Sequence, residues 1–194
     1  NFVMSSTGRH VAHGMTKGGS EWQTWKIYDL FTARKLKDEL TGLIHEYVLW
    51  LPNGKEFLYI RHSLPEKNAR ANSYRFPAIY LHRLGTPQSE DRLIYERKDK
   101  PKWYIGPSAA FHGKLAILTC WTEKSDRCIV VAKYLDKKVG KLSQKVIPIF
   151  ERADASYRYF ASRKNLLFFI TDKGADKGRV IAVPFDLRTG KVGK

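Results

Sequence analysis

Residues 53–59 read Asn-Gly-Lys-Glu-Phe-Leu-Tyr, a turn dipeptide followed by a base and then an apolar run. An Asn-Gly pair ahead of apolar residues is a strong signal for a hairpin turn that enters a β-strand. Similar turns stand at Gly8, Gly113 and Asn165, and Asn is expected to keep the positive φ that Gly provides elsewhere. With Gly54, these markers are 46, 59 and 52 residues apart, which predicts four repeated units.

Each marker strand is followed by a second strand rich in β-branched and aromatic residues, and helical periodicity is absent over any useful length. The second strands are predicted at residues 25–30, 78–84, 128–134 and 179–183, a third at 92–96, and strands ahead of the turn at 44–50, 103–109 and 157–161. Four strands in about 50 residues is the arrangement of a propeller blade. A β-sandwich is the alternative, although its strands need not recur as units.

We therefore expect an all-β fold, a β-propeller segment of about four blades. Each blade would be a four-stranded antiparallel sheet, and the blades would form a partial ring. Residues 1–194 would be one partial propeller domain, with blades near 1–38, 39–101, 102–152 and 153–194.

The composition fits a folded protein, with 43% hydrophobic residues and no apolar run near the roughly 18 residues of a membrane span. The chain begins at Asn1, directly in strand-like sequence, so we expect it to derive from a longer protein. The net charge of +16 favours acidic partners. The basic residues are scattered over predicted turns, however, which favours solvated loop tips over a dedicated anion-binding face.

Two cysteines lie in one predicted hairpin, residues 115–121 and 127–135. A loop centred on Lys124 would place Cys120 opposite Cys128, so a cross-strand disulfide is geometrically possible. Reduced, partly buried thiols are the favoured interpretation for two cysteines in a chain of this length. No second Cys or His pair stands at ligand spacing, so a zinc site is not expected. No other metal site and no cofactor are expected either.

No catalytic residue is expected in this chain. The nucleophile elbow Gly-x-Ser-x-Gly is absent, and Ser20, which precedes a strand, is interpreted as a turn residue. Residues 14–19 read Gly-Met-Thr-Lys-Gly-Gly, which lacks the phosphate-binding pattern and is interpreted as a hairpin loop.

The polar residues near strand ends are assigned structural roles. His10 and His13 are expected on one face of a strand or its edge, and Asp29 and Asp186 are expected to cap turns. The five tryptophans could stack on nucleic-acid bases, but packing between blades is the favoured role. They are Trp22, Trp25, Trp50, Trp103 and Trp121.

Residues 80–91, Tyr-Leu-His-Arg-Leu-Gly-Thr-Pro-Gln-Ser-Glu-Asp, closely resemble the propeller of prolyl oligopeptidases, where a His-x-Leu-Gly-Thr turn precedes a Gln-Ser-Glu-Asp segment. Weaker matches in the same order lie at residues 19–29, 95–103 and 178–182, whereas 104–150 match poorly.

The resemblance implies a parent enzyme, cytoplasmic like its family, that cuts short peptides after proline. A seven-bladed propeller would cap an α/β-hydrolase domain with a Ser-Asp-His triad and act as a size filter. This chain would hold roughly four blades and lack the triad. Its partners would be the missing catalytic domain and short peptides, with no membrane and only weak, non-specific nucleic-acid binding. The alternative is a basic propeller that binds acidic protein or nucleic acid.

The resemblance also implies a channel wall. The family uses a Phe before a strand-end Trp, a Met after the next blade's Trp and an Arg on the following strand. These positions fall on His45, Tyr104 and Trp121, none of which keeps the family's residue. They are the candidate substrate-facing residues of this chain.

Overall fold

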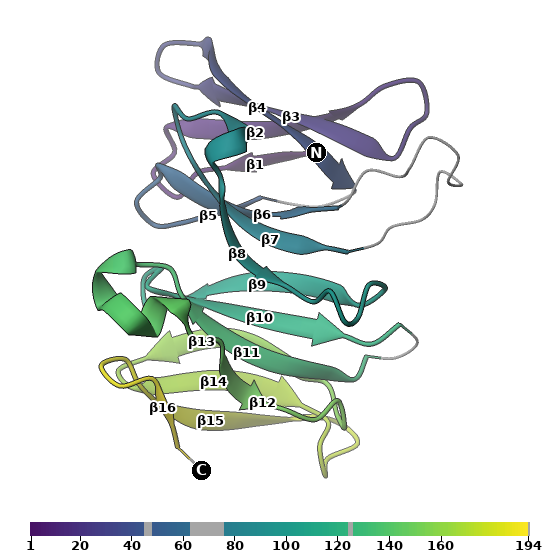
Figure 1. Cartoon of the computed structure of the whole chain (residues 1–194), viewed down its shortest axis with the longest axis vertical. Helices are drawn as coiled ribbons and strands as arrows, with labels where there is room; N and C mark the ends of the chain where they lie inside the picture. The colour runs from purple at the N-terminus through teal and green to yellow at the C-terminus, as the bar shows by residue number, and fades with distance from the viewer. Residues whose placement is uncertain (45–47, 63–75, 124–125, 194) are drawn as a thin grey trace. The chain divides into compact units, whose positions relative to one another are not determined.

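The computed structural model describes residues 1–44, 48–62, 76–123 and 126–193 (Figure 1). They form four antiparallel sheets, each of four strands that neighbour one another in chain order. The helical segments in these ranges are two 3-10 turns, η1 (Gln88–Glu90) and η2 (Lys137–Gln144). The predicted all-β fold of four blades is thus confirmed. None of the described helices is long and apolar enough to cross a membrane.

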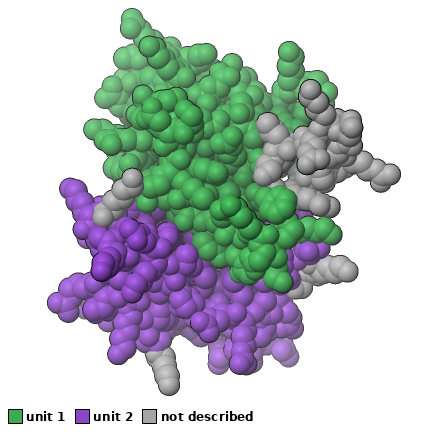
Figure 2. Space-filling model, viewed as in Figure 1, with its two compact units in different colours: residues 1–102 green, residues 103–194 purple. Residues whose placement is uncertain are grey.

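The chain divides into two compact units, residues 1–102 and 103–194 (Figure 2). Unit 1 holds the first two sheets. Their strands are β1 (Phe2–Met4), β2 (His10–Thr16), β3 (Trp22–Asp29) and β4 (Arg34–Ile44), then β5 (Leu49–Trp50), β6 (Glu56–Arg61), β7 (Ala78–Arg83) and β8 (Arg92–Glu96). The first sheet therefore runs to Ile44, beyond the boundary expected after residue 38.

Unit 2 holds the third and fourth sheets. Their strands are β9 (Tyr104–Ala110), β10 (Leu115–Trp121), β11 (Cys128–Tyr134) and β12 (Ile147–Phe150), then β13 (Tyr157–Arg163), β14 (Leu166–Thr171), β15 (Arg179–Asp186) and β16 (Lys191–Val192). The strands predicted from the repeat lie within or close to these elements, except that the strand expected at residues 44–50 includes residues 45–47, which lie outside the described residues.

The repeated turns use positive φ as predicted at Gly8 (71°), Gly54 (61°) and Gly113 (79°). The prediction for Asn165 is wrong, because the positive φ there falls one residue earlier, on Lys164 (55°). A two-residue hairpin loop can take its left-handed residue at the first position, so the turn survives without a left-handed Asn.

Each unit buries its core between its own two sheets. In unit 1, Trp25 and Leu40 of the first sheet pack in one buried cluster with Trp50, Phe57 and Tyr59 of the second. Trp50 Nε1 also donates to the Val3 carbonyl oxygen at 3.0 Å, which satisfies the polar atom of a buried indole. In unit 2, the third sheet contributes Leu115, Ile117 and Tyr134, and the fourth contributes Phe169 and Phe185. The packing role predicted for Trp25 and Trp50 is confirmed.

Candidate functional site

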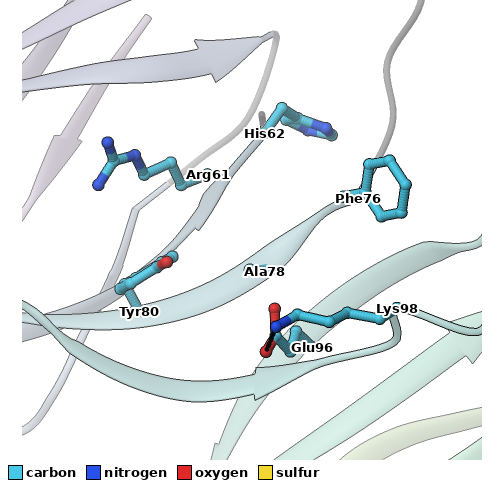
Figure 3. A pocket seen from close by; sticks show the side chains of 7 residues that line it. All are labelled: Arg61, His62, Phe76, Ala78, Tyr80, Glu96 and Lys98. Carbon is cyan, nitrogen blue, oxygen red and sulfur yellow. Dashed lines mark ion pairs between the residues drawn. The ribbon is translucent and has the colours of Figure 1, made fainter. Parts of the chain in front are cut away.

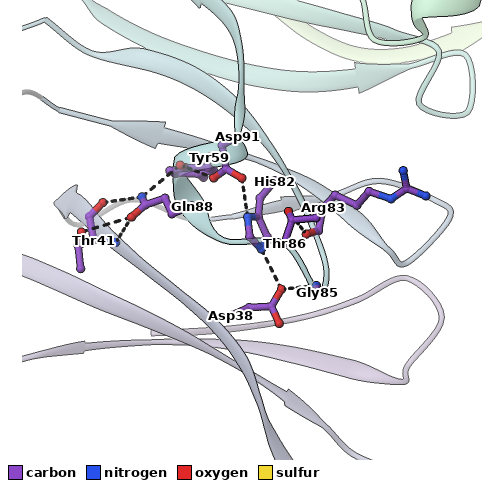
Figure 4. A network of polar contacts seen from close by, with 9 residues as sticks. All are labelled: Asp38, Thr41, Tyr59, His82, Arg83, Gly85, Thr86, Gln88 and Asp91. Atoms are coloured by element: carbon purple, nitrogen blue, oxygen red, sulfur yellow. Dashed lines mark hydrogen bonds and ion pairs between the residues drawn. The ribbon is translucent and has the colours of Figure 1, made fainter.

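A buried polar network centred on His82 joins the two sheets of unit 1 (Figure 4). His82 lies on β7, and its ring contacts one carboxylate from each side. Its Nδ1 is 2.7 Å from Asp91 Oδ1, just after η1, and its Nε2 is 3.0 Å from Asp38 Oδ1 on β4 of the first sheet. The Gly85 amide also donates to Asp38 Oδ1 at 2.7 Å. The side chains of the three ionisable residues are 0–2% exposed.

The carboxylates determine the protonation of His82. Burial alone would lower the pKa of His82, but the hydrogen bonds and charges of Asp38 and Asp91 outweigh burial and raise it to about 9. For Asp38 the signs are reversed. Burial raises the pKa of this carboxyl, but the hydrogen bonds from His82 and the Gly85 amide outweigh burial and hold the pKa below the ordinary 3.8. At neutral pH His82 is therefore an imidazolium that donates to two carboxylates.

The network continues to the first sheet through a second route. Tyr59 on β6 donates its hydroxyl to Asp91 Oδ2 at 2.7 Å, and Gln88 Nε2 donates to that hydroxyl oxygen at 3.1 Å. Gln88 also pairs with the backbone of Thr41, since Oε1 accepts from the Thr41 amide and Nε2 donates to the Thr41 carbonyl. The Gln88 side-chain amide thus makes the two backbone hydrogen bonds to Thr41 of β4 that a neighbouring strand would make. Asp38 and Thr41 both lie on β4, so the network contacts that strand at two points.

The network resembles acid–base machinery in its residue types but has no access to a substrate. A general acid or base must lie within hydrogen-bond reach of the reacting group, and these side chains are sealed from solvent. Its contacts instead tie β4 to the second sheet. The run 80–91 stands out by its resemblance, but no signal in the sequence shows that four of its residues form an inter-sheet lock, namely His82, Gly85, Gln88 and Asp91.

A pocket of about 560 Å³ opens at one end of the second sheet (Figure 3). It lies where β6 and β8 end and β7 begins. Its lining is mixed, with bases, one acid and aromatic rings: Arg61, His62, Phe76, Ala78, Tyr80, Glu96 and Lys98. The structure describes no group of three His, Cys, Asp or Glu side chains in these ranges that could hold a metal ion.

Two of the three candidate substrate-facing residues meet at one end of the third sheet. Tyr104 opens β9 and Trp121 closes β10, and they are direct cross-strand partners. Tyr104 is 58% exposed. The Trp121 ring covers Gly106, where an added Cβ would lie 2.8 Å from it, and the indole packs against the core of unit 2. The third candidate, His45, lies outside the described residues.

The other assigned residues have the structural roles expected of them, with two corrections. Asp29 Oδ1 accepts from the Phe31 and Thr32 amides, and Ser20 Oγ accepts from the Trp22 amide, as turn residues do. Asp186 accepts likewise from the Arg188 amide. His10 and His13 do not share a face, because residues three apart on a strand point to opposite sides. His10 stacks on Trp50 of the second sheet, whereas the His13 ring is tilted against Tyr28 of its own sheet.

Gly14 belongs to β2 and not to the predicted loop. It pairs with Trp25, whose indole crosses the glycine so closely that an added Cβ would lie 2.3 Å from Cε2.

The two cysteines are buried thiols outside any disulfide, and they are not opposite each other. Cys120 pairs with Ile129, and Cys128 pairs with Trp121. This register differs by one residue from a hairpin centred on Lys124, and a one-residue shift moves a side chain to the other face of the sheet. The cross-strand disulfide is therefore excluded, and the favoured interpretation of reduced thiols holds.

Four sheets of this kind, locked in pairs by buried inter-sheet contacts, define a segment of β-propeller. The family model for the prolyl oligopeptidase N-terminal beta-propeller domain matches residues 1–191, and the chain belongs to this family.

Individual relatives agree with this assignment. The chain is 24% identical to prolyl oligopeptidase A of Amanita bisporigera. The alignment covers 95% of this chain and 26% of that protein. The chain is also 24% identical to the prolyl endopeptidase of Dictyostelium discoideum, of which it covers 29%. The chain thus spans about a quarter of the length of the curated relatives it matches.

Solved structures show the same fold. One comes from a study of two prolyl endopeptidases and of inter-domain dynamics in their catalysis and specificity. That structure matches with a TM-score of 0.82 at 25% identity, and the match covers 100% of this chain and 27% of that one. Prolyl oligopeptidase B from Galerina marginata, solved with a 35-residue substrate for hydrolysis and macrocyclization, matches with a TM-score of 0.86 at 20% identity. The match covers 100% of this chain and 28% of that one.

Proposed function

We propose that this chain is the non-catalytic propeller portion of a prolyl-oligopeptidase-like serine endopeptidase. It would gate the access of peptides to a catalytic α/β-hydrolase domain that lies outside these residues. The observation that carries the proposal is the family match over residues 1–191, in a chain that spans about a quarter of its relatives. The ionisable cluster of Asp38, His82 and Asp91 is sealed from solvent, which agrees with chemistry supplied by another domain.

The inter-sheet lock supports a gating role in physical terms. A propeller can exclude large molecules only if neighbouring blades resist separation. In unit 1 that resistance comes from apolar packing and from buried ionic contacts between Asp38, His82 and Asp91. Breaking such contacts leaves buried charges unpaired, so the sheets stay together under ordinary fluctuations.

The test uses the parent protein and a series of fluorogenic proline-containing peptides of increasing length. We expect hydrolysis that a serine-directed inhibitor abolishes and that declines steeply with substrate length. Asp38→Asn, which weakens the lock, should raise the relative rate for the longest peptides and leave the shortest unchanged. Arg9→Gln, which removes an ion pair within the first sheet, is the matched control. A length preference that Asp38→Asn leaves unaltered would contradict gating by blade separation.

The net charge of +16 favours a second candidate, a basic module that binds acidic protein or nucleic acid. We expect binding to single- or double-stranded DNA to be weak, independent of sequence and strongly weakened by salt, because scattered lysines release counterions without contacting base edges. Anisotropy titrations at several salt concentrations measure this. Tight, sequence-selective binding at physiological salt would promote the second candidate over the first.

A further inference from the structure

The pocket of the second sheet is built on a cross-strand row. Arg61 on β6 pairs with Ala78 on β7, and Ala78 pairs with Glu96 on β8. Directly paired residues project from the same face of a sheet, so a short alanine side chain stands between two long charged ones. Figure 3 shows Arg61 on one side of the hollow and Glu96 on the other, with Ala78 between them. The pocket therefore follows from the residue sizes in this row.

The Arg61 side chain is held in place at two points. Its stem lies against Gly42 of the first sheet, where an added Cβ would be 3.2 Å from Arg61 Cγ. Its guanidinium carbon lies 5.7 Å from the centroid of the Tyr80 ring, within cation–π range. Tyr80 is itself stacked on the buried Tyr59, with ring centroids 5.8 Å apart. The guanidinium is thus oriented before any ligand arrives, which reduces the entropic cost of binding.

The pocket carries more positive than negative charge, with Arg61 and Lys98 against Glu96. Lys98 Nζ lies 3.1 Å from Glu96 Oε1, so the acid of the pocket is already paired with a base. No carboxylate of the described residues forms an ion pair with Arg61. The pocket consequently offers a positioned guanidinium whose charge is uncompensated in the described part of the chain.

The remaining wall is aromatic. Phe76 is 41% exposed, and its backbone has a positive φ of 55°, which is costly for a residue with a Cβ. Its amide donates to the Pro101 carbonyl oxygen at 2.8 Å, which helps to hold this conformation. An exposed phenyl ring and a guanidinium that line the same pocket suit a ligand that carries both an anionic and an apolar group.

We propose that this pocket binds the C-terminal carboxylate of a peptide, with Arg61 as the anion-binding residue and an apolar last side chain against Phe76. The choice of a peptide over another carboxylate rests on the proposed function, whereas the carboxylate chemistry rests on the pocket. A guanidinium can donate two parallel hydrogen bonds to a carboxylate, which an amide end cannot accept in the same way.

The test measures binding of an N-acetylated tripeptide, acetyl-Gly-Ala-Phe, as the free acid and as the C-terminal amide. The peptide lacks proline, so a proline-specific active site in the full chain would not consume it. We expect the free acid to bind at least about tenfold more tightly than the amide, which corresponds to a charge-assisted hydrogen bond. Arg61→Gln should remove this difference. Acetate alone should compete weakly, which separates peptide binding from simple anion binding.

Two further variants keep the proposal falsifiable. Arg83→Gln is the matched control, because Arg83 lies on β7 of the same sheet but pairs with Glu56 at the opposite end, and it should bind like the wild type. Glu96→Gln leaves Arg61 intact and frees Lys98, so it should strengthen binding of the free acid and not of the amide. Equal binding of acid and amide by the wild type, or an unchanged preference in Arg61→Gln, would overturn the proposal. Neither result would bear on length-dependent hydrolysis, which tests gating separately.

Discussion

His82 Nε2 on β7 lies 3.0 Å from Asp38 Oδ1 on β4, and this contact joins the second sheet to the outer strand of the first. The ring's other nitrogen is held by Asp91, so an imidazolium stands between two carboxylates in a solvent-free environment. The amide of Gly85 and the hydroxyl of Tyr59 donate to the two carboxylates and offset their excess of negative charge. The buried polar atoms of the lock therefore all have hydrogen-bond partners only when every member is present.

Replacing His82 by Gln should destabilise unit 1 strongly. The substitution removes the cation and leaves Asp38 and Asp91 buried without it, which typically costs about 3–5 kcal/mol. Urea unfolding followed by tryptophan fluorescence measures the loss, because Trp25 and Trp50 lie in the core of this unit. Lys26→Gln is the control, since it removes an ion pair within the first sheet whose two side chains are 28% and 50% exposed, and it should change stability little. Similar losses in the two variants would contradict a special role for the buried pair.

The lock should also give unit 1 a characteristic pH dependence. The pKa of His82 is about 9 in the folded chain against an ordinary 6.5, so its contribution is fully present below pH 6.5 and is lost as the pH rises through 9. The pKa of Asp38 is lowered, so its contribution is present above about 3.8 and is lost as the pH falls further. Urea midpoints should thus decline between pH 6.5 and 9. The decline should be much smaller in His82→Gln, and an equal slope in that variant would assign it to other groups.

Gly14→Ala should destabilise the first sheet through overpacking. An alanine Cβ would lie 2.3 Å from Cε2 of Trp25, which is fully buried and donates its Nε1 to Gln23. Inserting a methyl group into such a contact typically costs about 1–3 kcal/mol. Trp25→Leu removes the ring atoms that the methyl would strike. In a double-mutant cycle, Gly14→Ala should therefore cost less when Trp25 is already Leu, and additive losses would show that the backbone yields instead.

The repeat made the blades predictable because each unit starts from a glycine or asparagine turn and a run of buried apolar residues. The strand β4 was not predicted. It is an outer strand of its sheet. In its first half the inward positions are Leu36, Asp38 and Leu40, so a charged residue interrupts the apolar positions and the hydrophobic alternation is weak. Its ends are defined by pairing with β3, which sequence patterns do not show.

The lock and the pocket were harder to predict because they depend on distant residues. Asp38 and His82 are 44 residues apart, and nothing in the sequence around either identifies the other as its partner. The pocket depends on the register that aligns Arg61, Ala78 and Glu96. Register was also the reason for the error over Cys120 and Cys128, where one residue of loop length decides the face on which each side chain lies.

Trp121 provides a test of the channel wall, and we predict that Trp121→Arg in the full-length protein changes substrate preference. The resemblance places an arginine at this position in the family, where it could hydrogen-bond a peptide carbonyl or carboxylate. The tryptophan replaces that charge by a flat apolar surface, and its cross-strand partner Tyr104 adds an exposed aromatic ring. We therefore expect the wild type to prefer bulky apolar residues upstream of proline, and Trp121→Arg to shift the preference towards smaller or polar ones.

The control must separate the channel from stability, because the Trp121 ring also covers Gly106 and packs on the core of unit 2. Trp121→Phe keeps an apolar ring and loses part of this packing, so it should lower the melting temperature while retaining the preference. Turnover is compared across peptides varied at the residue upstream of proline, with thermal unfolding of each variant in parallel. If Trp121→Arg lowers turnover of every peptide by the same factor, the indole acts through packing alone, and the substrate-facing role fails at this position.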